Sequence, residues 1–171
     1  MVRVGSTVLF FLALSAWAGA QGSPRPSLSA ADQIRLHRAN RVLLADLVDR
    51  GVELGNASHP VDRAEACRKT ARVLGVALQK AAEADDADRV AELGNHLELV
   101  VRDGLVPILD EAKRNIHPMS PDAARLKAVL ENASGDLEWA WSAIPTTGKS
   151  GDSARVRDIS SKLGGLREKL K

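Results

Sequence analysis

Hydrophobic residues recur every three to four positions along most of the chain beyond residue 28, which is the spacing of one helix face. In the first such segment, residues 29–56, leucines form the stripe and valines flank it (Leu36, Leu43, Leu47 and Leu54, with Val48 and Val52). Ser29 followed by Asp32 is typical of a helix start, and Gly55 with Asn56 is typical of a helix end. The pattern therefore predicts a first helix over this segment.

A second helix is expected from Pro60, because proline suits the first position of a helix. Its stripe consists mainly of small residues and ends near Ala81. The acidic group Asp85, Asp86 and Asp88 marks the start of a third helix, since acids at a helix N-terminus oppose the helix dipole. Pro107 is expected to break or kink this helix, which continues to about Ile116.

Ser120 followed by Pro121 predicts the start of a fourth helix, which carries its apolar face to Ile144. Residues 145–152 contain proline and glycine and are expected to form a loop. Residues 153–171 place five apolar residues at helical spacing among basic ones, which predicts a basic amphipathic C-terminal helix (Val156, Ile159, Leu163, Leu166 and Leu170).

These elements predict an all-α fold. Four helices with short connections favour an antiparallel four-helix bundle of up-down-up-down topology over residues 29–144, with residues 153–171 as an additional helix. Composition supports a helical core. The chain has no tyrosine, and only Trp139 and Trp141 are aromatic beyond residue 20, so aliphatic side chains must fill the interior.

The first twenty residues have the three parts of a cleavable signal peptide. Arg3 supplies the positive charge, Val8 to Ala18 is an apolar run, and Ala18-Gly-Ala20 is a small-residue cleavage site. Residues 21–28 contain two prolines and are expected to be a flexible lead-in. No later segment is apolar enough for a transmembrane helix in the mature chain. We therefore expect an extracytoplasmic product, periplasmic or secreted.

Charge argues against nucleic acid as a partner. The net charge is only +2, which is no phosphate-binding footprint. The charge is nevertheless uneven, because residues 147–171 hold seven Lys or Arg and three Asp or Glu. This basic helix could bind a partner groove, an anionic surface or the acidic body of its own chain.

The chemical motifs of enzymes and cofactor proteins are missing from the sequence. No haem-attachment or di-iron spacing is present, and no nucleophile signature is found, so we expect neither an enzyme nor a cofactor. The alternative is a metal- or haem-binding bundle that uses His37 and His96, which fall within the first and third helices. The acids at 85–88 lack the glycine of a calcium loop and are better explained by helix capping.

Three kinds of residue remain as candidates for contact with a partner. Trp139 points away from the stripe that contains Trp141, and tryptophan is enriched at interface centres. The C-terminal helix adds exposed cations (Arg155, Arg157, Lys162 and Arg167). Cys67 is the single cysteine of the sequence and cannot form an intramolecular disulfide. It is therefore either a small buried residue or one half of an intermolecular disulfide. The leading expectation is an exported, non-catalytic helical protein with an interaction, structural or sensory role and an unknown protein partner.

Overall fold

The computed structural model describes residues 29–170, and every regular element in this part of the chain is a helix. The all-α prediction is confirmed. The predicted signal peptide and lead-in lie outside the described residues. The helices are α1 (Ala30–Asn56), α2 (Pro60–Glu83), α3 (Ala87–Leu99), the π-helix η1 (Val100–Leu105), α4 (Val106–Asn115), α5 (Pro121–Ser142), α6 (Gly148–Gly151) and α7 (Ala154–Lys169).

Side chains cap three of the helices at the positions where the sequence predicts that these helices begin. The Nδ1 atom of His59 accepts a hydrogen bond from the Val61 N–H at the start of α2. Asp86 accepts one from the Arg89 N–H at the start of α3, and Ser120 accepts one from the Ala123 N–H at the start of α5. Each of these bonds satisfies an amide that the first helical turn leaves without a partner.

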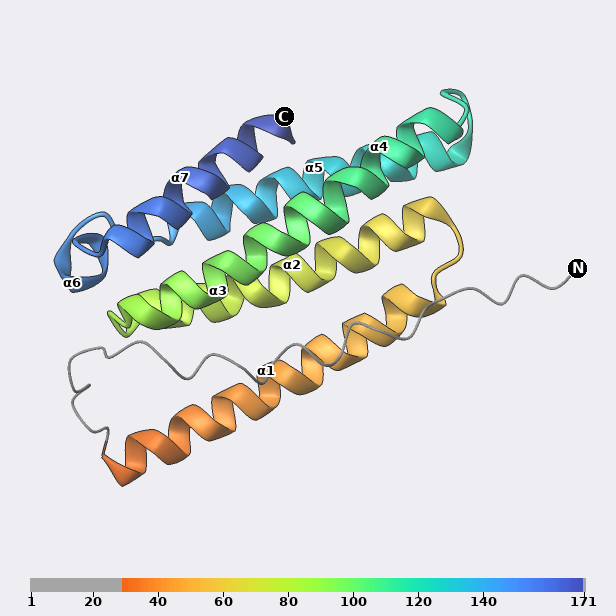
Figure 1. Ribbon diagram of the computed structural model, residues 1–171. Coiled ribbons are helices and arrows are strands. Elements are labelled where there is room, and N and C mark those ends of the chain that lie inside the picture. The colour runs from red at the N-terminus through yellow and green to blue at the C-terminus, as the bar shows by residue number, and fades with distance from the viewer. Residues whose placement is uncertain (1–28, 171) are drawn as a thin grey trace, which may run out of the picture. The chain divides into compact units, whose positions relative to one another are not determined.

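The expected break near Pro107 takes the form of a π-helix just before it. The Val106 N–H donates to the carbonyl of Val101, five residues back, so the turn contains one residue more than an α-helical turn. Proline has no N–H to donate, which weakens the α-helical pattern at this point. The chain continues directly from η1 into α4, and Figure 1 shows α3, η1 and α4 as one continuous run.

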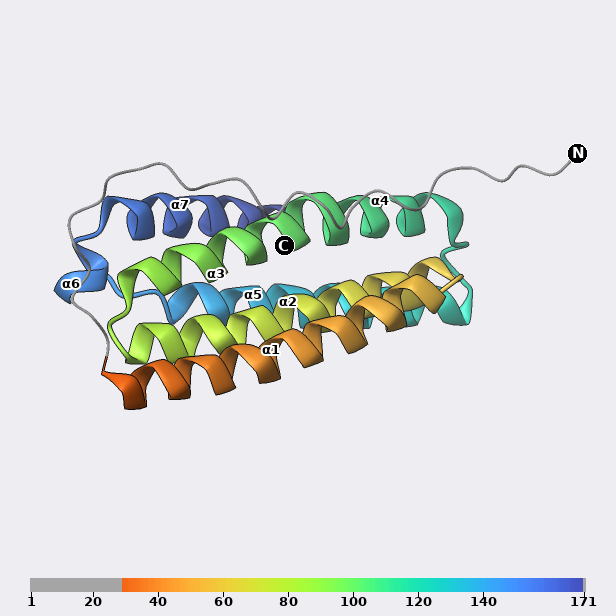
Figure 2. The ribbon, with the colours of Figure 1, turned by 60° about the horizontal axis from the view of Figure 1, so that its bottom comes forward.

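The core is built by α2, α3, η1, α4, α5 and α7. α2 packs against α3 and α5, and α7 packs against α3 and α5 (Figure 1, Figure 2). All five apolar residues of the C-terminal seam are buried in this core (Val156, Ile159, Leu163, Leu166 and Leu170). The last helix is thus an integral part of the packed interior rather than an addition to it.

The first helix contributes less than its leucine stripe suggests. No α1 side chain whose exposure is described is buried, although Leu43, Leu47 and Leu54 are partly covered by the core. Two polar contacts also hold α1, from Lys69 of α2 to Glu53 and from Arg89 of α3 to Asn40. The C-terminal helix α7, which the sequence left either packed along the bundle or free, is therefore more deeply buried than α1.

The segment expected to be a loop contains the one-turn helix α6. It is fixed to the start of α3, because the Asp85 carboxylate accepts a hydrogen bond of 2.9 Å from the Ser150 N–H. Hydrogen bonds from Ser150 also lower the pKa of Asp85. The acidic residues at 85–88 therefore serve two purposes, since Asp86 caps α3 and Asp85 holds the connection that leads to α7.

Candidate functional site

Trp139 is partly exposed and lies on the surface between α5 and α2. It retains 39% of its accessible surface, and its ring packs over Gly75 of α2. Trp141 is more covered: its indole N–H donates to the Ser160 carbonyl at 3.0 Å, and the Arg167 guanidinium lies 4.3 Å from its ring centroid. Both tryptophans thus join helices within the chain, and Trp139 also offers part of its ring to solvent.

The basic residues of α7 make contacts within the chain. Arg155 pairs with Asp88 of α3 at 2.8 Å, and Arg167 pairs with Glu138 of α5 at 3.3 Å. Arg157 donates to the carbonyls of Gly151 and Asp152, and Lys162 pairs with Asp158 one turn away. Among the three alternatives for this helix, the structure therefore shows the one in which it docks on its own chain.

Cys67 is buried on α2 and faces η1. Only 3% of the residue is exposed, and its Sγ atom lies beside Gly104. Burial raises the pKa of the Cys67 thiol, which reduces the fraction of reactive thiolate. Of the two alternatives, this position fits the small buried residue, because an intermolecular disulfide would require the core to open.

His37 on α1 and His96 on α3 are both exposed. Within residues 29–170, no group of three or more His, Cys, Asp or Glu side chains is arranged to hold a metal ion. The two other histidines have local roles at helix ends. His59 caps α2 and lies 3.4 Å from Asp122, and the Nδ1 atom of His117 accepts from the Met119 N–H.

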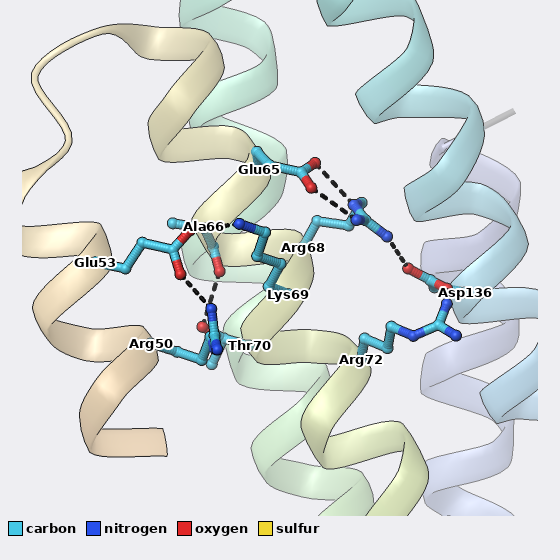
Figure 3. A network of polar contacts seen from close by, with 9 residues as sticks. All are labelled: Arg50, Glu53, Glu65, Ala66, Arg68, Lys69, Thr70, Arg72 and Asp136. Atoms are coloured by element: carbon cyan, nitrogen blue, oxygen red, sulfur yellow. Dashed lines mark hydrogen bonds and ion pairs between the residues drawn. The ribbon is translucent and has the colours of Figure 1, made fainter. Parts of the chain in front are cut away.

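A network of charged side chains joins α2 to α5 and α1, and sequence reasoning missed it (Figure 3). Arg68 makes two hydrogen bonds to Glu65 and a third, of 2.5 Å, to Asp136 of α5. Arg72 reaches the other oxygen of the Asp136 carboxylate. Arg68 and Asp136 keep only 15% and 13% of their side-chain surface exposed, so water screens their attraction incompletely.

The charges in this network shift one another's pKa. The hydrogen bonds from Arg68 lower the pKa of Glu65, and the hydrogen bond from Lys69 lowers that of Glu53. The bonds to Glu65 and Asp136 raise the pKa of Arg68 further above its usual range, against the opposing effect of burial. Each buried charge has a partner, as expected of a network that fixes helices rather than one that binds a ligand.

A cavity beside this network has room for about one water molecule (≈ 10 Å³). Arg68 and Asp136 form its polar side, and apolar residues from α2, α3, η1 and α5 form the rest (Ala71, Leu97, Val101, Leu105, Ala133 and Leu137). A space of this size fits a bridging water and excludes an organic substrate.

The outer face of α1 is the most apolar exposed stripe in the described part of the chain. Leu44, Val48 and Val52 remain 61%, 60% and 58% exposed, and their spacing of four residues aligns them on one side of the helix. We call these three residues the α1 stripe. The sequence showed Val48 and Val52 beside the leucines, but it did not show that they would be left uncovered. Contiguous exposed apolar surface of this kind marks interaction sites.

The comparisons with known proteins give no further guide to this surface. No protein-family model, curated protein or solved structure matches the chain. In residues 29–170, no helix is both long enough and apolar enough to cross a membrane.

Proposed function

We propose that this chain is an exported, non-catalytic interaction module that presents the α1 stripe to a protein partner. In this proposal the helices α2, α3 with α4, α5 and α7 form an antiparallel bundle that acts as a rigid support. α1 lies on the support through its inner leucines and turns the α1 stripe outward. The observation that carries the proposal is the exposure of Leu44, Val48 and Val52 together on one helix face.

The uses of the reactive side chains support a non-catalytic role. Cys67 is buried in the core, His59 and His117 cap turns, and the charges around Arg68 are paired with one another. The small cavity beside Asp136 has no room for a substrate. These residues are therefore explained by folding, whereas the α1 stripe is not.

The N-terminal sequence supports export. A charged start, an apolar run and Ala18-Gly-Ala20 are the features that signal peptidases recognise. If they act as proposed, mass spectrometry of the extracytoplasmic fraction should find a chain that begins at Gln21. Replacement of Ala18 and Ala20 by a large residue should leave the leader attached, and a chain found only in the cytoplasm in both cases would contradict the proposal.

The binding function can be tested by affinity capture with matched variants. The double substitution Val48→Gln and Val52→Gln replaces two of the three apolar side chains of the α1 stripe by polar ones. Glutamine is used because it favours the helical conformation. Leu99→Gln is the control, because Leu99 is a large apolar residue of α3 that is also about half exposed. Wild type and the control should capture the same extracytoplasmic protein after cross-linking, and the double variant should lose it. Equal capture by all three would show that the α1 stripe is not the binding surface.

A further inference from the structure

The exposed face of α1 carries a free positive charge on the N-terminal side of the α1 stripe. Arg41 is exposed and lies three residues before Leu44 and seven before Val48, spacings that place it in line with the stripe. Arg41 forms no ion pair with the described part of the chain. The sequence explains this, because the positions three and four residues away on either side hold no acid (His37, Arg38, Leu44 and Ala45).

Two glycines shape the C-terminal side of the same face. Gly51 lies three residues after Val48, and Gly55 lies three residues after Val52, so both open onto the side that carries the α1 stripe. A Cβ atom at either glycine would meet nothing within 4 Å. Glycines four residues apart on a helix surface let the backbone of another helix approach closely. This part of the face is therefore shallow, which suits a helix lying along it.

The acidic residues in this part of α1 lie away from the face. Asp46 lies two residues before Val48 and Asp49 one residue after it, which rotates them by about 200° and about 100° from that position. Glu53 pairs with Lys69 of α2. The face that contains the α1 stripe is thus apolar, with a positive charge at one end and no negative charge.

A partner that complements this face must be apolar along most of the contact and negative at one end. An amphipathic helix meets both requirements, and an antiparallel direction brings the negative end of its dipole to Arg41. We propose that the partner of the α1 stripe is an amphipathic helix of another protein, which lies antiparallel to α1 and carries an acidic residue in the turn that faces Arg41. This inference rests on the proposed function and states the chemistry of the partner.

The composition of the face favours a protein helix over an anionic membrane surface. Helices that insert into the surface of a bilayer typically present tryptophan, phenylalanine or leucine above a polar side rich in lysine and arginine. The α1 face instead offers one leucine, two valines and two glycines between residues 44 and 55, with no aromatic residue. The exposed acids Asp46 and Asp49 beside it would also repel anionic lipids.

Two matched synthetic peptides test the proposal on the chain as recovered from the cells that express it. Both are stapled helices with leucines four residues apart, and they differ only in the last turn, which holds glutamates in one and lysines in the other. The Kd from fluorescence anisotropy should be about five- to tenfold lower for the glutamate peptide, because attraction to Arg41 replaces repulsion. Arg41→Glu should reverse this preference. The control Arg114→Glu makes the same charge change at an exposed residue of α4 and should leave the preference unchanged.

The failures of the two proposals can be distinguished. Val48→Gln with Val52→Gln should weaken the binding of both peptides, and circular dichroism should show that all variants are folded. Equal Kd values for the two peptides, or a preference that Arg41→Glu does not reverse, would overturn the acidic partner. The proposed function would still stand if capture of an extracytoplasmic protein depended on Val48 and Val52. Binding of neither peptide would overturn the helical partner, and binding of phosphatidylglycerol vesicles instead would assign the face to a membrane surface.

Discussion

The place of α7 in the core can be tested with one substitution. Leu163 is completely buried (0% exposed), on the helix that packs against α3 and α5. Leu163→Ala removes most of its side chain and leaves a cavity, which in packed cores costs about 2–5 kcal/mol of unfolding free energy. For a folded region of this size, 1 kcal/mol lowers Tm by about 3 °C. A loss of about 3 kcal/mol should therefore lower Tm by about 10 °C.

The neighbouring residue provides a matched control. Lys162 is about half exposed, and its Nζ atom pairs with Asp158 at 2.7 Å on the same helix. Lys162→Ala should change the unfolding free energy by no more than about 0.5 kcal/mol, as is usual for exposed pairs one turn apart. Both variants should be followed by circular dichroism during thermal and urea unfolding. If Leu163→Ala melts at the same temperature as Lys162→Ala, α7 does not belong to the cooperative core.

Three further predictions concern packing, charge and the thiol. Gly94→Ala should destabilise the chain by about 1–3 kcal/mol, because the added Cβ atom would lie 2.6 Å from the Ile159 side chain of α7. Gly135→Ala is the control: its Cβ atom would meet nothing within 4 Å, so it should stabilise the helix by about 0.5–1 kcal/mol. Urea unfolding of both variants measures these changes. The lowered pKa of Glu65 contributes stability above its unfolded pKa of about 4.3, and this contribution disappears as the pH falls through the folded value. Glu65→Gln should therefore flatten the acid limb of a stability profile, and an unchanged limb would contradict the role of the Arg68 bonds. Cys67 should react with a thiol reagent at the rate of unfolding, and rapid labelling of the native chain would show that the helices around it open readily.

Local capping chemistry explains why the helix boundaries could be predicted. His59 with Pro60, Asp86, and Ser120 with Pro121 act within one turn of the residues whose amides they satisfy. Such contacts can be predicted from the sequence because both partners are close together along the chain. The turn at Asp85 shows where local information ends, because its carboxylate bonds to Ser150, sixty-five residues away.

Periodicity reveals that a helix has an apolar face but does not reveal how completely that face is covered. The leucines of α1 and the mixed aliphatic residues of α7 have similar spacing, yet α7 is buried and α1 is only partly covered. The deciding factor is the set of neighbouring helices, which depends on tertiary packing. The same limit applies to the candidate site, since the bond from Arg68 to Asp136 joins residues that are far apart in the sequence.

The exposure of the α1 stripe carries a cost that a partner could offset. Full burial of a valine or leucine side chain stabilises a protein by roughly 1.5–3 kcal/mol, so the three side chains together leave several kcal/mol unrealised in the isolated chain. Polar residues at these positions would keep the helix and its inner leucine contacts while avoiding this loss. The inner leucines Leu43, Leu47 and Leu54 pack partly against the core, whereas the outer residues take no part in that contact. A binding role accounts for apolar residues at Leu44, Val48 and Val52, and it predicts that their replacement by glutamine should reduce association far more than it reduces the stability of the monomer.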